Sequence, residues 1–251
     1  MSDACGSESQ NDGIQALYTE LATHPEKDFG WGKGKENARL LGYDTEWLDR
    51  LPEAIWESDA AVGNPFHLGP IRPGETVIDL GCGAGADACV AALLVGDSGN
   101  VIGVDITPAM VAKARDNATL ACLANIKIHE ADIAELKIPD ECADVVISNG
   151  AINLSARKAC VLKEAFRVLR PGGRLQIADM VRDKPGDSTE TISSDDWADC
   201  IAGTLAPERF VSMIEEAGFM NIRPLETTGY RTSRSTLGAL FYAERPVDRG
   251  A

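Results

Sequence analysis

Residues 76–87 read TVIDLGCGAGAD, and this stretch decides the fold. Its first residues are apolar and mostly β-branched, as in a buried strand of a parallel sheet. Gly81, Gly83 and Gly85 follow at alternate positions, and an unbroken apolar helix is predicted over 88–95. Glycines in such a turn let a ligand approach the backbone, and the start of the helix presents free N–H groups to it. The stretch therefore predicts a nucleotide-type site between a strand and a helix.

Two kinds of nucleotide fit this loop. Gly81, Gly83 and Ala86 match the dinucleotide fingerprint, and Asp105 lies at the expected distance of about 20 residues further on. Asp79 favours the other kind, because a carboxylate here repels a pyrophosphate and attracts the ammonium of a methionine. In this feature DLGCGAG resembles the first motif of class I S-adenosylmethionine-dependent methyltransferases. The resemblance implies S-adenosyl-L-methionine as the cofactor, and an NAD-dependent oxidoreductase is the alternative.

Strands and helices alternate along the rest of the chain. Further strands are predicted at 100–105, 126–129, 143–148 and 174–178, and helices at 108–123, 155–169, 197–202 and 208–217. Thr107 and Ser155 are predicted to cap two of these helices. Two last strands, near 222–228 and 236–243, have no helix between them, as in the methyltransferase family. The order predicts an α/β fold with a doubly wound, Rossmann-like, mostly parallel seven-stranded sheet and a C-terminal antiparallel hairpin.

The region before this domain is predicted to be helical. We expect residues 1–70 to form a helical extension or lid, and residues 71–251 to form the methyltransferase domain. Residues 1–12 are polar and predicted to be disordered, with a short helix over 14–22. Pro65 predicts an extended turn before the first strand. Phe29 and Trp31 lie in a glycine-rich loop, where they either cover a bound ligand or anchor the lid to the core.

Charge and hydrophobicity limit the partners of the protein. The chain has 251 residues and a net charge of −15, which repels a polyanion such as DNA or RNA. No apolar run reaches the ~18 residues of a membrane span, and the N-terminus lacks the features of a signal peptide. The seven cysteines contain no CxxC pair, which argues against a zinc site or a disulfide framework. We expect a cytoplasmic protein with a small-molecule acceptor, no nucleic-acid or membrane partner, no metal, and an undetermined oligomeric state.

Polar residues follow the carboxyl ends of four predicted strands. In open α/β sheets the ligand binds beyond these ends, so the four side chains are expected to converge on it. Asp105 suits the ribose, because a carboxylate accepts two hydroxyl hydrogen bonds. Asp132 and Ile133 suit the adenine, and Asp79 and Asn149 the methionine end, although each carboxylate alone also fits a cap or a surface charge. The predicted cofactor-binding set is Asp79, Gly81, Gly83, Gly85, Asp105, Ile106, Asp132, Ile133 and Asn149.

Longer stretches narrow the resemblance to one branch of the family. DLGCGAGAD, VIGVDITPAMVAKAR, DVVISNGAINL and RVLRPGGRL, followed by a Trp197-x-x-Cys200 motif, resemble arsenite methyltransferases over about 61–219. That branch binds trivalent arsenic with cysteine thiolates, which are soft ligands for a soft metalloid. The resemblance matches one of these cysteines to Cys200, whereas Val62 and Gly150 occupy the other two positions. We therefore expect an organic acceptor, and arsenite methylation well below the rate typical of the branch.

Candidate residues on the acceptor side are few. Asn149, Asn153, Trp197 and Cys200 are the predicted catalytic residues. His67 and Asp196 are weaker candidates for a base, because His67 also fits a packed surface imidazole, and Cys200 also fits a buried packing residue. Two alternatives remain open: an arsenite methyltransferase with another thiol set, including Cys5 or Cys142, and a non-catalytic S-adenosylmethionine-binding module.

Overall fold

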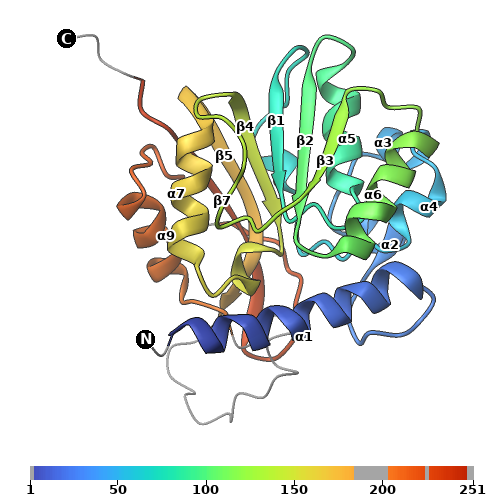
Figure 1. Cartoon of the computed structure of the whole chain (residues 1–251), viewed down its shortest axis with the longest axis horizontal. Coiled ribbons are helices and arrows are strands. Elements are labelled where there is room, and N and C mark those ends of the chain that lie inside the picture. The colour runs from blue at the N-terminus through green and yellow to red at the C-terminus, as the bar shows by residue number, and fades with distance from the viewer. Residues whose placement is uncertain (1–2, 184–202, 224–225, 248–251) are drawn as a thin grey trace.

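A seven-stranded sheet forms the centre of the molecule in a computed structural model, which describes residues 3–183, 203–223 and 226–247 (Figure 1). The strands are β1 (Thr76–Leu80), β2 (Asn100–Asp105), β3 (Ile126–Glu130), β4 (Ala143–Asn149), β5 (Leu169–Arg182), β6 (Glu226–Thr227) and β7 (Thr236–Glu244). Their order is β3-β2-β1-β4-β5-β7-β6, with β1 to β5 parallel and β7 antiparallel to both of its neighbours. The predicted fold class is confirmed, and the strand order reverses between β1 and β4.

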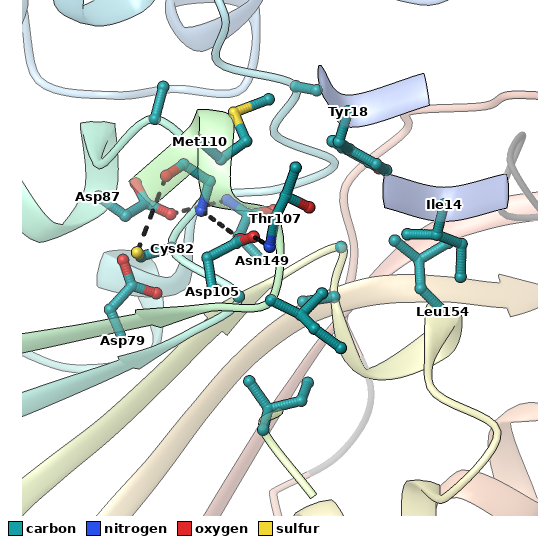
Figure 2. Close-up of a pocket in the computed structure, with 18 of the residues that line it drawn as sticks. Ile14, Tyr18, Asp79, Cys82, Asp87, Asp105, Thr107, Met110, Asn149 and Leu154 are labelled. Carbon is teal, nitrogen blue, oxygen red and sulfur yellow. Dashed lines mark hydrogen bonds between the residues drawn. The ribbon is translucent and has the colours of Figure 1, made fainter. Parts of the chain in front are cut away.

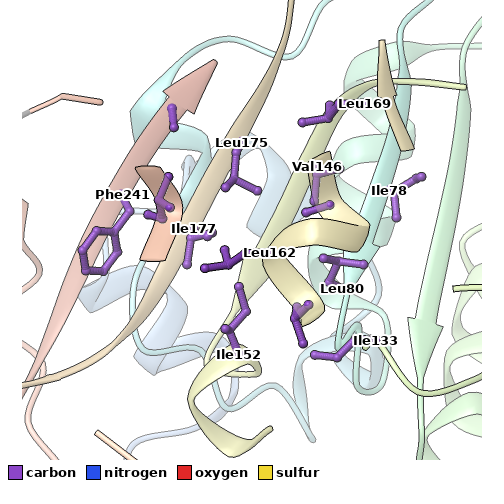
Figure 3. Close-up of a cluster of buried hydrophobic side chains, with 14 of the residues drawn as sticks. Ile78, Leu80, Ile133, Val146, Ile152, Leu162, Leu169, Leu175, Ile177 and Phe241 are labelled. Carbon is purple, nitrogen blue, oxygen red and sulfur yellow. The ribbon is translucent and has the colours of Figure 1, made fainter. Parts of the chain in front are cut away.

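Helices cover both faces of this sheet, which explains why its strands are apolar on both sides. Alternate residues of the central strands point to opposite faces. Ile78 and Val146 belong to a core cluster with the helices α7 and α9 (Figure 3), whereas Val77 and Val145 belong to a second cluster with α5. The bounds of the four helices that follow strands of the domain are as follows: α5 spans Ala86–Val95, α6 spans Pro108–Leu120, α7 spans Lys158–Val168 and α9 spans Pro207–Glu216.

The N-terminal region is helical, but its first helix is longer than predicted. It contains α1 (Asp3–Thr23), α2 (Gly34–Leu40), α3 (Thr45–Arg50), α4 (Glu53–Trp56) and the 3₁₀ helix η1 (Pro65–Leu68). The prediction of disorder over 1–12 is wrong for residues 3–12, which belong to α1. These residues continue a helix whose later turns pack on the domain, where Leu21 is fully buried against Ala84 and Met110. No helix of the described part of the chain is long and apolar enough to cross a membrane.

Two local predictions differ from the structure. Pro65 opens the 3₁₀ helix η1 rather than an extended turn, because its fixed φ suits a first helical position and the Asn64 side chain accepts the Phe66 N–H. Ser155 does not cap α7, which begins at Lys158 after a second 3₁₀ helix, η2 (Ile152–Leu154). Its hydroxyl accepts the N–H of Arg157 in the intervening turn. The helix predicted over 197–202 lies outside the described residues.

Candidate functional site

A cleft lies at the carboxyl ends of the parallel strands, where the strand order reverses. Its empty space, including the part open to solvent, is about 1210 Å³. Figure 2 shows the carboxylates of Asp79, Asp87 and Asp105 gathered at one end. Ile14 and Tyr18 of α1 form an apolar wall at the other end. The acidic end of the cleft thus lies at the strand ends and the start of α5, and the N-terminal helix contributes to its apolar side.

In the glycine loop between β1 and α5, Gly81 and Gly83 line the cleft, whereas Gly85 is not among the lining residues. All three have positive φ. At Gly81, with φ +74°, a Cβ would lie 2.1 Å from the Cβ of Ala151, so only glycine fits. At Gly83, with φ +51°, a Cβ would meet no atom within 4 Å. Gly85 is the N-cap of α5 in the left-handed conformation. Gly81 therefore serves packing, whereas Gly83 leaves its backbone open to a ligand.

Asp105, at the end of β2, connects the glycine loop to the start of α6. One carboxylate oxygen accepts the N–H of Gly83 at 2.9 Å, and the other accepts the N–H of Thr107 at 2.8 Å. Thr107 is the N-cap residue, as predicted, but its own side chain makes no cap hydrogen bond. Burial raises the pKa of Asp105, and the backbone N–H donors partly offset that rise. The Thr107 hydroxyl and the Ile106 N–H also interact with this carboxylate, so the loop and the start of α6 hold it at the edge of the cleft.

Asp79, at the end of β1, is buried in the cleft with an unpartnered oxygen. Its side chain is 1% exposed, and its Oδ2 has no hydrogen-bond partner. Its carboxylate accepts the N–H of Ala88. Burial raises its pKa well above the ordinary value, and the like charges of Asp87, Asp105 and Asp59 raise it further. A positively charged ligand would relieve this arrangement, since a buried carboxylate without a partner is costly.

A hydrogen-bond network occupies the side chain of Asn149. Its amide donates to Asp87 at 3.0 Å, to the Tyr43 hydroxyl at 3.0 Å and to the Gly63 carbonyl at 2.9 Å. Its oxygen accepts the N–H of Val62 at 3.0 Å. Asn149 lines the cleft, but these contacts direct its amide to the protein. Sequence reasoning did not single out Asp87 or Tyr43, and only the carboxylate of Asp87 beside the glycine loop could have signalled the network.

The adenine-side residues predicted from the sequence also line the cleft. Asp132, after β3, accepts the N–H of Ala134 at 2.7 Å and pairs with the exposed Arg157 at 2.7 Å. Ile106 and Ile133 add apolar surface beside it. This end of the cleft therefore combines an anchored carboxylate with an apolar wall, which suits a flat heterocycle that carries an amine.

Other candidates lie away from the cleft. Asn153 is buried outside the lining, where its backbone N–H donates to Asp179. His67 is exposed, with its Nε2 3.1 Å from the Gly42 carbonyl. Phe29 and Trp31 lie 5.4 Å apart, ring centre to ring centre, and neither lines the cleft. Trp197, Cys200 and Asp196 lie outside the described residues.

Val62 and Gly150, at which the resemblance to arsenite methyltransferases places cysteines, lie next to each other in the cleft wall. Gly150 has φ +69°, and a Cβ there would lie 3.5 Å from Cγ1 of Val62. Both residues line the cleft, although 88 positions separate them in the sequence. Cys82 is the one cysteine among the described lining residues, and burial raises its pKa well above the ordinary value. The described residues contain no group of three or more His, Cys, Asp or Glu side chains placed to hold a metal ion.

Comparisons with known proteins agree with this geometry. The profile of a methyltransferase domain family matches residues 71–218. The arsenite methyltransferase of Halobacterium salinarum is 40% identical over 179 residues, which are 71% of this chain and 46% of that protein. The arsenite methyltransferase of Aquipseudomonas alcaligenes is 36% identical over 215 residues, which are 78% of this chain and 61% of that protein. The chain thus spans about half the length of the curated relatives that it matches.

The solved structures similar to this chain also include a methyltransferase that acts on arsenic. An arsenic(III) S-adenosylmethionine methyltransferase from Chlamydomonas reinhardtii is 29% identical, with a TM-score of 0.62, and the match covers 88% of this chain and 76% of that one. A [4+2]-cyclase is 19% identical with a TM-score of 0.67, which is a likeness of fold alone. Since one fold serves different reactions, the residues of the cleft have to decide the chemistry.

Proposed function

The chain belongs to the methyltransferase domain family, and on that premise we propose that it transfers a methyl group from S-adenosyl-L-methionine to a small-molecule acceptor. One observation carries this proposal: Asp79, at the end of β1, has a buried oxygen without a partner beside an open glycine loop. A dinucleotide would place a pyrophosphate near this carboxylate, and the two charges would repel each other. The ammonium of a methionine would instead pair with it, which disfavours the NAD-dependent oxidoreductase.

The residues of the cleft fit this cofactor in chemistry and order. Asp79 suits the ammonium, Gly83 suits close approach of the ligand to the backbone, and the Asp105 carboxylate at the end of β2 suits the ribose hydroxyls. Asp132 and Ile133 suit the adenine amine and ring. These assignments support the cofactor-binding set proposed from the sequence, with Asn149 as a residue that positions its neighbours.

The chemistry needs alignment rather than a strong base. Bound S-adenosylmethionine supplies an electrophilic methyl group on a sulfonium. The described residues hold the carboxylates at one end of the cleft and build the opposite wall from apolar side chains, including Ile14, Tyr18 and Leu154. Such a site orients an acceptor and excludes water from it, which is what a direct displacement requires. Trp197 and Cys200 remain proposals for the acceptor side.

For the acceptor we propose an organic molecule rather than arsenite. Val62 and Gly150 adjoin in the cleft wall without a thiol, and a trivalent arsenic needs two or three converging thiolates. Cys142 is a poor replacement, because it precedes β4 whereas the cleft lies at the other end of that strand. Cys82 lines the cleft, but its raised pKa keeps the thiol protonated. The relatives named arsenite methyltransferases keep the arsenic acceptor as the second candidate.

Calorimetry with S-adenosylmethionine and with NAD tests the cofactor. We expect micromolar or tighter binding of the methyl donor and none of NAD. Asp105→Ala should abolish donor binding, because the variant loses both the ribose acceptor and the partner of the Gly83 N–H. Asp97→Ala, which changes an exposed aspartate, is the control. Binding of NAD alone would refute the proposal.

A panel of thiol, phenol and amine acceptors tests turnover. We expect release of S-adenosylhomocysteine and a product heavier by one CH₂ unit in mass spectrometry. Donor binding without product from any acceptor would favour the non-catalytic module. From the net charge of −15 we also propose that nucleic acid is not a partner. A cytoplasmic location without a membrane partner, expected from the lack of a long apolar run, stays part of the proposal.

A further inference from the structure

Like Asp79, a second aspartate of the cleft has a buried carboxylate oxygen without a hydrogen-bond partner. Asp59 follows helix α4 and lines the cleft, and its Oδ2 is buried without a hydrogen-bond partner. It comes from the N-terminal region, whereas Asp79 comes from the sheet. The side chains of Asp59, Asp79 and Asp87 are close enough to affect one another's charge. No feature of the sequence around Asp59 predicts this role.

Within the described part of the chain, no basic side chain pairs with Asp59 or Asp79. Arg157 is the one Lys or Arg side chain among the described residues that line the cleft, and it pairs with Asp132. The other charged side chains near Asp59 and Asp79 are the carboxylates of Asp87 and Asp105. Burying an unpaired carboxylate lowers stability, so Asp59 and Asp79 together destabilise the ligand-free protein. A bound cation is the partner that they lack.

We propose that Asp59 is a second carboxylate for the ammonium group of S-adenosylmethionine, which binds between Asp59 and Asp79. The proposal rests on the proposed function and extends the cofactor site into the N-terminal region. An ammonium has three N–H donors and needs more than one acceptor, whereas Asp79 offers one unpartnered oxygen. Asp59 supplies another from the opposite segment of the chain.

The backbone around Asp59 holds it in place. Its N–H donates to the Trp56 carbonyl at 2.9 Å, and its carbonyl accepts the N–H of Gly34 at 2.7 Å. The hydroxyl of Ser58, the preceding residue, donates to the Leu21 carbonyl of α1 at 2.9 Å. Contacts with three helical segments therefore hold the backbone that carries the Asp59 carboxylate at the cleft.

Ligand binding should also release protons. Burial raises the pKa of both Asp59 and Asp79 well above the ordinary value, and the like charge of Asp87 adds to it. The titratable groups near them are Asp87 on α5, Asp105 on β2, Tyr43 before α3, and the thiols of Cys82 and Cys89 beside Asp79. The free protein therefore holds protons on this pair up to a higher pH than an exposed aspartate would. An ammonium between the two carboxyl groups favours their ionised form, and the displaced protons pass to the buffer.

The experiment compares the wild type with Asp59→Asn, and uses Glu57→Gln as a matched control in the same segment. The control side chain is 50% exposed and lies 3.9 Å from Lys113. The probes are S-adenosylhomocysteine, which keeps the ammonium, and methylthioadenosine, which lacks the amino-acid part. Calorimetry in two buffers of different ionisation enthalpy gives the affinity and the number of protons released. Thermal unfolding without ligand gives the stability.

We expect Asp59→Asn to weaken S-adenosylhomocysteine binding about ten- to a hundredfold, the loss of one charge-assisted hydrogen bond. It should release fewer protons, bind methylthioadenosine like the wild type, and melt no lower than the wild type without ligand. Glu57→Gln should behave as the wild type in every measurement. Asp59→Ser removes the same charge with a smaller side chain and should repeat the result.

Several results would overturn the assignment. An unchanged affinity of Asp59→Asn for S-adenosylhomocysteine would overturn it. If turnover alone fell, Asp59 would act on the acceptor rather than on the cofactor. A lower melting temperature of both Asp59→Asn and Asp59→Ser without ligand would also overturn the assignment, because the Asp59 carboxylate would then stabilise the fold. If the wild type binds neither probe, the proposed function itself fails. If the wild type binds S-adenosylhomocysteine and Asp59→Asn binds it equally well, only the assignment of Asp59 fails.

Discussion

At the scale of single residues, Asp87 joins parts of the chain that are far apart in sequence. Its carboxylate accepts the Tyr43 hydroxyl at 2.7 Å and the Asn149 amide at 3.0 Å. Burial raises the pKa of Asp87 to about 6, and these two hydrogen bonds oppose the rise. The network also holds the backbone of Val62 and Gly63 through Asn149. Asn149 thus positions the wall of the cleft, while its predicted catalytic role stays a prediction.

Tyr43→Phe should expose the role of Asp87 through pH. The pKa of Asp87 in the folded protein lies above the ordinary value of 3.8, so its ionisation opposes folding and stability falls as pH rises towards about 6. Without the Tyr43 hydroxyl this pKa rises further, so the fall continues above pH 6. We expect a loss of about 1–2 kcal/mol at pH 8 and a smaller loss at pH 5, measured by urea unfolding. Equal losses at both pH values would contradict this assignment.

At the scale of elements, the glycine loop separates packing from binding. Gly81 lies against Ala151, of the segment after β4, and leaves no room for a side chain. Gly83 has open space around it, and its N–H is held by Asp105. The same strand-to-helix turn therefore contains one glycine that the fold requires and one that the ligand requires.

Gly83→Ala and Gly81→Ala should fail in different ways. Gly83→Ala should fold with a loss of about 1–2 kcal/mol, the cost of a side chain at positive φ, but bind the donor poorly because its methyl group projects where the ligand approaches. Gly81→Ala should lower the melting temperature far more, since its Cβ would lie 2.1 Å from that of Ala151. Gly229→Ala, at φ +78° with open space, controls for the backbone strain alone. Full donor binding by Gly83→Ala would refute the role of this glycine.

At the scale of the whole molecule, the fold brings together the two positions at which the resemblance to arsenite methyltransferases led us to expect thiols. Val62 precedes η1, and Gly150 follows β4. They adjoin because the segment before the first strand returns over the carboxyl end of β4, where Asn149 binds the Val62 N–H. Two thiols placed here would be in contact distance of each other, as soft-metalloid binding requires.

Val62→Cys/Gly150→Cys should therefore gain arsenite methylation in the presence of a reductant. We expect little turnover of arsenite by the wild type and a clear gain in the double variant that disappears when Cys200→Ser is added. The positive φ of Gly150 costs the variant about 1–2 kcal/mol, so its melting temperature is measured alongside. Strong wild-type turnover that survives Cys200→Ser would refute the thiol argument.

The sequence by itself determined the strand, glycine turn and helix at 76–95, the α/β fold class and the strand-end carboxylates. These follow from local periodicity and from the rule that ligands bind at the carboxyl ends of parallel strands. Asp79, Asp105 and Asp132 could be predicted for this reason, since a position at a strand end is a local property. All three line the cleft of the folded chain.

Only the tertiary structure decided which polar groups meet and which lack partners. Asp59 and Tyr43 come from the N-terminal region, and no periodicity indicates that they face residues of the sheet. Asn149 lies at the end of a strand, as predicted. Its side chain, however, is hydrogen-bonded to Asp87 and to the Val62–Gly63 backbone. The polar composition of residues 3–12 suggested disorder, whereas they continue a helix whose later turns pack on α6. Contacts between distant segments depend on how the whole chain packs, and local sequence does not contain that information.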